Sequence, residues 1–293
     1  MVYSHDNIKL LRIPFSLFLL PIYLFALSNV QAQDISVIQA VLVFFIIHLL
    51  VYPASNGYNS YFDRDEESIG GLKHPPKVSP GLYKLVVVLD VLSVALSLLI
   101  SIPFALLIVV YLFVSKAYSY DKIRLKKYPV ISTVVVTFFQ GAFTFFLVQF
   151  GSGVPMEHIL ETNNLILALV STLFLVGSYP LTQVYQHAED SRRGDLTISR
   201  MLGINGTYAF SAASLLLASA LLVWAYLEMG QVQNILLFLL FSVPVVVVFC
   251  QWLLQVQKDP RAVNFENTMR MNKTSSLCLG LAFLAIILWR LFI

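Results

Sequence analysis

The chain has 293 residues, of which 58% are hydrophobic and 12% are charged, with a net charge of +3 and a mean hydropathy of +0.79. Soluble domains carry about 25% charged residues, so this composition excludes a soluble globular domain and gives no sign of a nucleic-acid partner. The two cysteines, Cys250 and Cys278, lie inside apolar runs, which excludes a disulfide framework.

Nine apolar runs are long enough to span a bilayer, which takes roughly 17–25 residues. We therefore expect an all-α polytopic membrane protein with about nine transmembrane helices, forming a single domain over residues 1–293. The expected spans are 12–31, 35–58, 82–102, 104–120, 129–150, 163–185, 205–227, 232–256 and 274–293.

The first run has some features of a secretory signal, because Lys9 and Arg12 precede it and the sequence 30–32 resembles a cleavage site. However, Pro14 and Pro21 interrupt the run, and a second apolar run follows at once. We expect the first helix to be retained.

The positive charges are strongly asymmetric. In a nine-span arrangement, 18 of the 19 Lys and Arg residues fall on one side, and only Arg290 falls on the other. Cytoplasmic loops of membrane proteins are enriched in Lys and Arg. We therefore expect a bacterial inner-membrane protein with its N-terminus in the cytoplasm and its C-terminus outside.

An acidic segment follows the second run. Asn59, Asp63 and Glu67 are spaced at i, i+4 and i+8, so on a helix they share one face. Amide and carboxylate oxygens in this arrangement suit Mg2+, which usually binds together with a phosphate group. Taken alone, the segment is equally consistent with a solvated acidic loop that caps a span.

A second acidic segment, with Glu189, Asp190 and Asp195, follows the sixth run. A polar stripe leads into it at spacings of 4, 3 and 4, formed by Tyr179, Gln183, Gln186 and Asp190. Polar groups are costly in lipid, so this stripe is expected to face protein or a wet cavity.

The two segments form an internal repeat with an offset of 127 residues. Four pairs are identical and three are conservative, namely Tyr52/Tyr179, Pro53/Pro180, Tyr58/Tyr185 and Asp63/Asp190, with Ser55/Thr182, Asn56/Gln183 and Asn59/Gln186. We interpret them as two copies of one helix-end module in a pseudo-repeat of four-helix units, carried by residues 52–80 and 179–200. Glu67 corresponds to Gly194, so the third ligand is not repeated.

Two such sites on one membrane face, with about one metal each, can hold a diphosphate between them, and Mg2+ would make that diphosphate a better leaving group. The basic segment 122–127 is well placed to contact the same anion, through Lys122 or Arg124. The positive-inside bias alone also explains several of these residues.

At this point the sequence resembles the UbiA superfamily of intramembrane prenyltransferases. Its first signature is similar to Asn59, Asp63 and Glu67, although the last residue is usually Asp. Its second signature fits Asp190, Gly194 and Thr197, but Gln186 stands where the family has an Asp. Further similarities are the Tyr-x-x-x-Lys element at Tyr118 and Lys122, Arg12 in the first span, and Asn264 to Asn272.

The resemblance implies a prenyl diphosphate bound through Mg2+ at the cytoplasmic face, with its chain in an apolar cavity of the membrane domain. Loss of diphosphate would leave an allylic cation, which an aromatic or other lipophilic acceptor attacks. Aromatic faces of Tyr58, Tyr118 and Tyr185 are candidates to stabilise that cation.

The predicted site follows from the motifs and the resemblance together. The expected metal ligands are Asn59, Asp63, Glu67, Gln186 and Asp190. The expected catalytic residues are Asn59, Asp63, Asp190 and Lys122. The expected substrate contacts are Lys122, Arg124, Tyr118, Tyr58, Tyr185, Arg12, Asn56, Gln183 and Asp195.

Gln186 leaves two possibilities for the second metal, because a side-chain amide offers an oxygen without a negative charge. The metal binds more weakly there, or Glu189 or Asp195 substitutes. Two other functions also stay open, a membrane terpene cyclase and a repeat-built secondary transporter. Transporters place their sites near the membrane midplane, whereas here the acids cluster at one interface, which disfavours an ion path.

Asp90 lies well inside the third run. An intramembrane carboxylate is a functional candidate by default. For this one we favour a hydrogen bond to a Ser or Tyr of a neighbouring helix.

Overall fold

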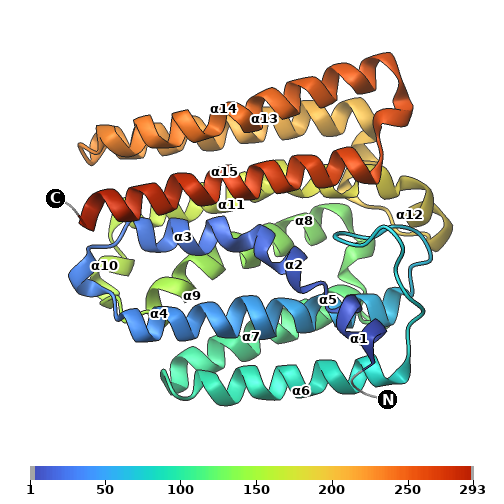
Figure 1. Cartoon of the computed structure of the whole chain (residues 1–293), viewed down its shortest axis with the longest axis horizontal. Helices are drawn as coiled ribbons and strands as arrows, with labels where there is room; N and C mark the ends of the chain where they lie inside the picture. The colour runs from blue at the N-terminus through green and yellow to red at the C-terminus, as the bar shows by residue number, and fades with distance from the viewer. Residues whose placement is uncertain (1–3, 292–293) are drawn as a thin grey trace.

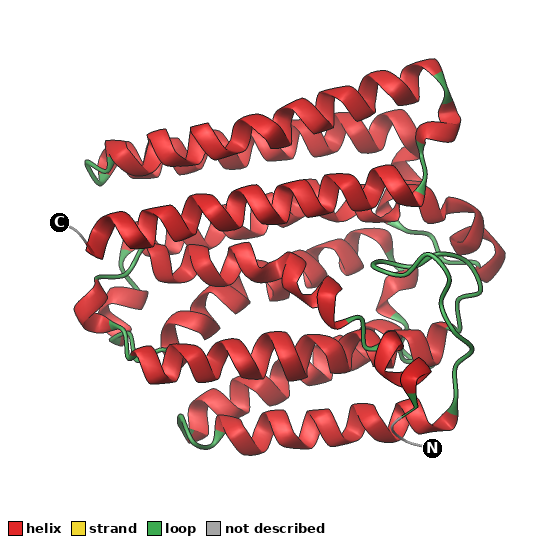
Figure 2. Ribbon diagram, in the orientation of Figure 1, coloured by secondary structure: helices red, strands yellow, loops and turns green. Residues whose placement is uncertain are grey.

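The computed structural model describes residues 4–291, and the secondary structure of these residues is helical apart from one isolated β-bridge between Ile69 and Leu72 (Figure 2). The helices are α1 (His5–Leu10), α2 (Ile13–Ser16), α3 (Leu20–Ser28), α4 (Val37–Phe44), α5 (Tyr52–Asp63), α6 (Pro80–Ser97), α7 (Ile102–Ser119), α8 (Pro129–Phe138), α9 (Thr144–Gly151), α10 (Met156–Ile159), α11 (Thr162–Gln183), α12 (His187–Arg193), α13 (Ile198–Glu228), α14 (Val232–Lys258) and α15 (Phe265–Leu291).

Within the described residues, nine helical segments are long and apolar enough to cross a membrane, which confirms the expected all-α polytopic fold. The spans are α1–α3, α4–α5, α6, α7, α8–α9, α11–α12, α13, α14 and α15. Several helices extend beyond the apolar runs, and the sixth span reaches Arg193 instead of residue 185. Backbone hydrogen bonding does not stop where hydropathy falls, so a helix continues into the polar interface.

The helices run side by side, with α13 and α14 along one edge of the bundle and α6 and α7 along the other (Figure 1). Helix α11 packs along α13, α14 against α15, and α15 against α3. Figure 1 shows the long loop after α5, helix α12 and helix α1 at the same end of the bundle, with the C-terminus at the opposite end. Both acidic segments are therefore at one end.

The first span is broken at Arg12. This residue adopts the left-handed conformation, with φ of 50°, between α1 and α2, and Pro14 and Pro21 each lie in the first turn of the following helix. A proline lacks the backbone N–H, so it fits the start of a helix better than its interior. The break allows the Arg12 side chain to reach the interior of the bundle, where it is 7% exposed.

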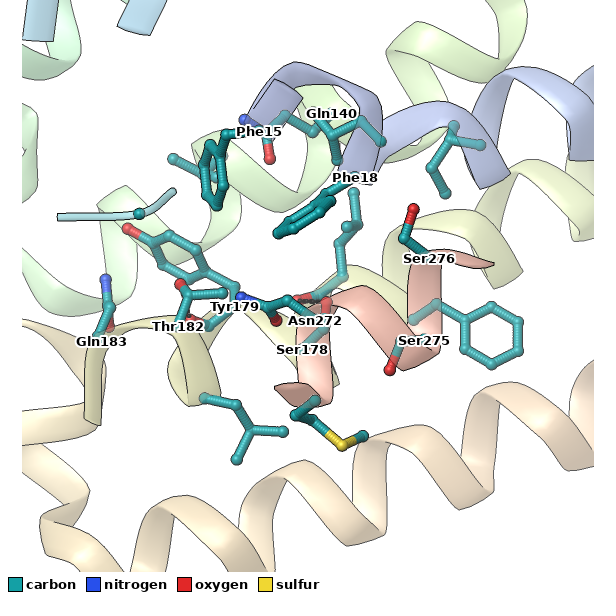
Figure 3. Close-up of a pocket in the computed structure, with 18 of the residues that line it drawn as sticks. Phe15, Phe18, Gln140, Ser178, Tyr179, Thr182, Gln183, Asn272, Ser275 and Ser276 are labelled. Carbon is teal, nitrogen blue, oxygen red and sulfur yellow. Dashed lines mark hydrogen bonds between the residues drawn. The ribbon is translucent and has the colours of Figure 1, made fainter. Parts of the chain in front are cut away.

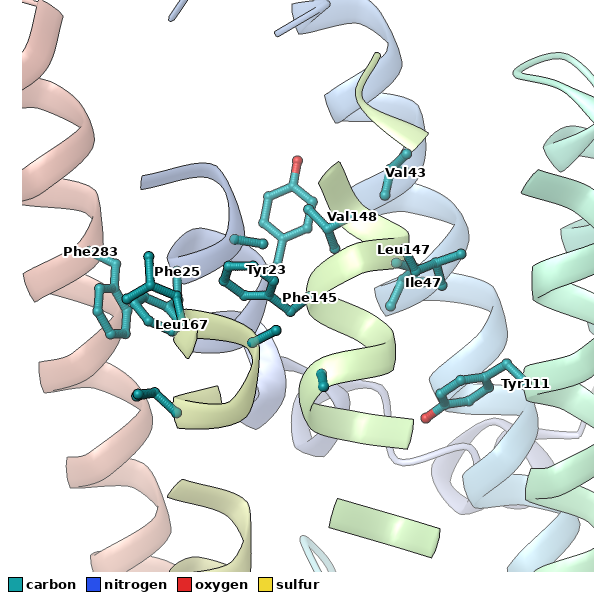
Figure 4. Close-up of a cluster of buried hydrophobic side chains, with 14 of the residues drawn as sticks. Tyr23, Phe25, Val43, Ile47, Tyr111, Phe145, Leu147, Val148, Leu167 and Phe283 are labelled. Carbon is teal, nitrogen blue, oxygen red and sulfur yellow. The ribbon is translucent and has the colours of Figure 1, made fainter. Parts of the chain in front are cut away.

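A buried hydrophobic cluster joins the first, fifth and ninth spans away from the acidic segments (Figure 4). Within it the ring of Phe25 lies 5.3 Å from that of Phe145 and 4.6 Å from that of Phe283, measured between centroids. Such tilted aromatic pairs stabilise packing beyond the area they bury. This half of the bundle is therefore closed by side chains.

Asp90 of α6 forms an ion pair with Lys116 of α7, with 2.9 Å between Oδ1 and Nζ. The expected Ser or Tyr partner is therefore wrong, since the partner is a lysine. Lys116 also lies over the ring of Tyr58, 5.0 Å from its centroid. The pair links α6 and α7 and places Tyr58 of α5 against them.

Candidate active site

A cavity of about 630 Å3 opens among the helices at the end that carries the acidic segments. The first segment contributes Asn59, Asp63 and Asp65 to its wall, and the second contributes Gln186 and Asp190. Most of the remaining wall is apolar and comes from the first, fourth, fifth, sixth, seventh, eighth and ninth spans. Two segments that are 127 residues apart thus meet at the charged mouth of one apolar cavity.

Asp63 is the last residue of α5 and is only 6% exposed. Its Oδ2 accepts a hydrogen bond from Asn59 Nδ2 at 2.6 Å. Its Oδ1 lies 2.5 Å from Lys126 Nζ and 3.7 Å from Arg124 Nη1. A buried carboxylate needs such partners, because leaving it unpaired away from water is costly.

The helix ends directly after Asp63, where Arg64 adopts the left-handed conformation with φ of 50°. The prediction that Glu67 shares one helical face with Asn59 and Asp63 is therefore wrong. Glu67 is exposed, pairs with Arg192 and does not line the cavity. Asp65 faces the cavity instead, where burial and the nearby charge of Asp63 raise its pKa.

Asn59 orients both Asp63 and Arg12. Its Nδ2 also donates to Ser119 Oγ at 2.9 Å, and its Oδ1 accepts from Arg12 Nη2 at 3.3 Å. Arg12 donates further to the backbone oxygens of Asn56, at 3.2 Å, and Gly70, at 3.3 Å. Among residues 4–291, the hydrogen bonds of this buried guanidinium go to neutral oxygens, so its charge is available to an anion in the cavity.

The basic segment 122–127 contributes Lys126 to the cavity wall, and not the expected Lys122 or Arg124. Lys122 is exposed and does not line the cavity, whereas Lys126 lines it and contacts both Asp63 and Asp195, the latter at 3.3 Å. Helix α7 ends at Ser119, and a left-handed residue, Arg124, leads into a tight turn over Leu125–Lys127. This turn brings Lys126 inward.

Arg124 binds Asp195 through two parallel hydrogen bonds, Nε to Oδ1 at 3.0 Å and Nη2 to Oδ2 at 2.9 Å. Burial alone would raise the pKa of Asp195, but the hydrogen bonds and charges of Arg124 and Lys126 outweigh it and hold that pKa below its ordinary value. Such bidentate pairs are geometrically specific. Arg124 therefore fixes the loop after α12 to the basic segment and does not itself line the cavity.

The polar stripe of the sixth span faces the cavity as expected, since Tyr179, Gln183, Gln186 and Asp190 all line it. The helix is not continuous, because a 3-10 turn over Val184–Gln186 separates α11 from α12. Gln186 Nε2 donates to the backbone oxygen of Ser68 at 3.3 Å. Asp190 Oδ2 accepts from Thr197 Oγ1 at 3.1 Å.

Of the three predicted tyrosines, only Tyr118 lines the cavity, and its hydroxyl lies 2.9 Å from that of Tyr179. Tyr58 packs against Phe62, with 4.6 Å between ring centroids, and Tyr185 packs against Phe265 at 5.9 Å. Neither Tyr58 nor Tyr185 reaches the cavity wall. Asn56 does line the cavity, next to Arg12.

The oxygen donors at the mouth fit Mg2+ only together with a phosphate ligand. Within residues 4–291 no group of three or more His, Cys, Asp or Glu residues can hold a metal by itself. Mg2+ commonly takes one or two carboxylates and completes its shell with water and phosphate oxygens. Asp63 and Asp65 of the first segment meet that requirement, and Asp190 of the second segment supplies one further carboxylate in the cavity wall.

Next to the charged mouth, neutral polar groups of α11 and α15 line the cavity (Figure 3). They are Ser178 and Thr182 on α11 and Asn272, Ser275 and Ser276 on α15. Asn272 Nδ2 is buried and has no hydrogen-bond partner among the described residues. Phe15 and Phe18 lie opposite, with ring centroids 5.2 Å apart in an edge-to-face arrangement.

Sequence reasoning missed Asp65, Lys126 and Arg193 as cavity-lining residues, and it noted Asn272 only through the family resemblance. The acidic character of 63–67 and the basic character of 122–127 were visible signals, but the positive-φ residues Arg64 and Arg124 decide which side chains point inward.

The model of the UbiA prenyltransferase family matches residues 18–274. Among solved structures, a digeranylgeranylglyceryl phosphate synthase is 20% identical with a TM-score of 0.59, covering 98% of each chain. A UbiA homolog from Archaeoglobus fulgidus bound to DMAPP and Mg2+ is 17% identical with a TM-score of 0.68, covering 96% of this chain and 99% of that chain.

A UbiA homolog from Aeropyrum pernix K1 is 19% identical with a TM-score of 0.70, covering 93% of this chain and 98% of that chain. These likenesses show a shared fold. No curated protein matches the sequence.

Proposed function

Because the chain belongs to the UbiA prenyltransferase family, we propose that it transfers a prenyl group from a prenyl diphosphate to an aromatic or other lipophilic acceptor, with Mg2+ as cofactor. The observation that carries this proposal is the meeting of the two acidic segments at the charged mouth of an apolar cavity. The Archaeoglobus fulgidus homolog bound to DMAPP and Mg2+ supports the same ligands here.

The mouth has the charges that a diphosphate requires. Asp63, Asp65 and Asp190 are the carboxylates proposed to hold Mg2+, which would neutralise the leaving group. Arg12 and Lys126 are the cations proposed to contact phosphate oxygens. With the diphosphate held there, the prenyl chain lies along the apolar wall.

The reaction breaks the bond between C1 of the prenyl group and a diphosphate oxygen, and the allylic cation forms at the boundary between mouth and apolar wall. Tyr118 and Tyr179 line the cavity with their hydroxyls 2.9 Å apart, and we propose that they face the cation. The acceptor then forms a bond to C1 and releases a proton.

The acceptor is proposed to place its polar head among the neutral groups of α11 and α15. Asn272 offers a buried donor without a partner, and a ligand oxygen would satisfy it. Phe15 and Phe18 provide an apolar surface for the rest of the acceptor. Given the distribution of Lys and Arg, we place this mouth at the cytoplasmic face of the membrane, with the N-terminus also in the cytoplasm.

The test is an assay of the purified protein with Mg2+, prenyl diphosphates of increasing length and a panel of aromatic acceptors, with diphosphate release and products measured. We expect release that needs Mg2+ and an acceptor, and that is lost in Asp63→Ala. Release and cyclic products without an acceptor would favour the terpene-cyclase alternative. If wild type shows no turnover above Asp63→Ala under any combination, the proposed function is wrong.

A further inference from the structure

We propose that the guanidinium of Arg193 takes the place of a second metal ion, so that the diphosphate site binds one Mg2+ instead of one at each acidic segment. This inference rests on the proposed function, and it concerns how the diphosphate charge is neutralised. It follows from the partners of the charged groups at the cavity mouth.

The second acidic segment has few carboxylate oxygens left for a metal. Gln186 is neutral, and its amide nitrogen is bonded to the backbone of Ser68. Both oxygens of Asp195 are held by the guanidinium of Arg124, at 3.0 and 2.9 Å, and Lys126 contacts the second of them at 3.3 Å. That leaves Asp190, whose contact with Thr197 is to a neutral hydroxyl. The second segment thus offers one carboxylate, whereas the first offers both Asp63 and Asp65, so a single Mg2+ is expected at the first segment.

The same segment contributes a cation to the mouth. Arg193 ends α12, its side chain is 19% exposed, and it lines the cavity. Its Nη2 lies 3.3 Å from Asp65 Oδ1, and its Nη1 lies 3.8 Å from Asp63 Oδ1. Arg193 of the second segment therefore pairs with the carboxylates of the first segment.

Glu189 holds this arrangement, since its Oε1 accepts from Arg193 Nε at 3.0 Å. The two Nη atoms remain directed at the mouth. A guanidinium presents paired donors that match phosphate oxygens. A Mg2+ held by Asp63 and Asp65 would leave these Nη donors for the diphosphate.

Arg192 provides a matched control on the adjacent position. Its side chain is 59% exposed, pairs with Glu67 and Glu189, and does not line the cavity. Both arginines lie in the last turn of α12 and contact Glu189. Only Arg193 faces the diphosphate position.

The test counts metal ions directly. Mn2+ replaces Mg2+ as a spin probe, and electron paramagnetic resonance measures the bound Mn2+ per chain of full-length protein in detergent with saturating farnesyl thiodiphosphate. We expect one Mn2+ for wild type and two for Gln186→Asp/Arg193→Ser. Two Mn2+ in wild type, or one in the double variant, would overturn the proposal.

Binding of the thiodiphosphate gives an independent readout at saturating Mn2+. We expect Arg193→Gln to raise its Kd about tenfold or more, as for a lost charge-assisted bond, and Arg192→Gln to leave it within about twofold. Arg193→Lys should bind one Mn2+ with intermediate affinity, which guards against a folding defect in Arg193→Gln. Equal effects of the Arg192 and Arg193 changes would contradict the proposal. No metal-dependent binding by wild type would instead count against the proposed function.

Discussion

Individual charged residues at the cavity mouth differ sharply in what their side chains reach. Asp63 and Asp195 are buried and both contact Lys126. Glu67, close to Asp63 in sequence, and Lys122, close to Lys126, are exposed. Arg12 is buried, and its hydrogen-bond partners in the described part of the chain are neutral oxygens. At this scale, burial and partner choice separate the groups that can act on a ligand from those that remain in solvent.

Lys126 and Lys122 can be compared directly. Lys126→Gln removes a cation that contacts Asp63 and Asp195 and lines the cavity, so we expect kcat/KM for the prenyl diphosphate to fall about 10–100-fold, as for loss of a buried charge-assisted contact. Lys122→Gln should change it less than about twofold, because the side chain is exposed. Diphosphate release measures both, and a larger effect at Lys122 would contradict the assigned positions.

The Arg124–Asp195 pair predicts a pH dependence of stability. The pKa of Asp195 is held below its ordinary value, so the pair stabilises the fold above the unfolded pKa of about 3.9 and loses that contribution as pH falls toward the lower folded pKa. The Tm of wild type should therefore exceed that of Asp195→Asn by about the same amount at pH 5 and at pH 7. The two Tm values should converge below about pH 4. A gap that widens on acidification would show that the sign is wrong.

At the scale of elements, the positions where helices end determine which side chains face the cavity. Helix α5 stops at Asp63 and the chain turns at Arg64, while the second copy is interrupted by a 3-10 turn before Asp190. The repeat therefore brings Asp63 and Asp190 to one mouth by two different local routes. The loop after α5 is held to α12 by Arg193–Asp65 and Arg192–Glu67 contacts, and to the 3-10 turn before α12 by the Gln186–Ser68 hydrogen bond.

Hydropathy was sufficient to predict the nine spans, because each is an independent apolar run. Periodicity was sufficient for Asn59, Asp63 and the stripe ending at Asp190, because these residues lie within or next to regular helix. It failed for Glu67, because the left-handed residue Arg64 ends the helix after Asp63. The expectation for Lys122 rested on the basic segment and the family resemblance, and α7 ends at Ser119 before reaching it. Periodicity also failed for the partner of Asp90, because the sequence does not give the register between two helices.

The Asp90–Lys116 pair is the clearest stability test between elements. Asp90→Asn leaves a largely buried lysine uncompensated between α6 and α7, and we expect a loss of about 3 kcal/mol in the free energy of unfolding. The double variant Asp90→Leu/Lys116→Met removes both charges and should recover most of that loss. Chemical unfolding in detergent measures it, and a double variant that is less stable than Asp90→Asn would contradict the account.

For the whole molecule, the bundle has one closed half and one half that contains the cavity. Aromatic side chains such as Phe25, Phe145 and Phe283 fill the former, and the acidic and basic segments surround the mouth of the latter. The described chain ends lie at opposite ends of the bundle (Figure 1). The charged residues around the cavity therefore lie at one end of an integral membrane protein.

The proposed orientation can be tested by cysteine labelling in intact cells. After Cys250 and Cys278 are replaced, a cysteine at Lys73, in the loop near the mouth, should resist a membrane-impermeant maleimide added outside. A cysteine at the exposed Glu161, in the opposite loop, should react. The reverse pattern would place the mouth on the outer face.

The central claim is that both acidic segments form one diphosphate site. Its most direct test is equilibrium binding of a prenyl thiodiphosphate in Mg2+ to wild type, Asp63→Asn, Asp190→Asn and, as control, Glu67→Gln. We predict that both Asp variants lose affinity by at least about tenfold and that Glu67→Gln binds as wild type does. Wild-type affinity in either Asp variant would show that its segment does not belong to the site and would contradict the account.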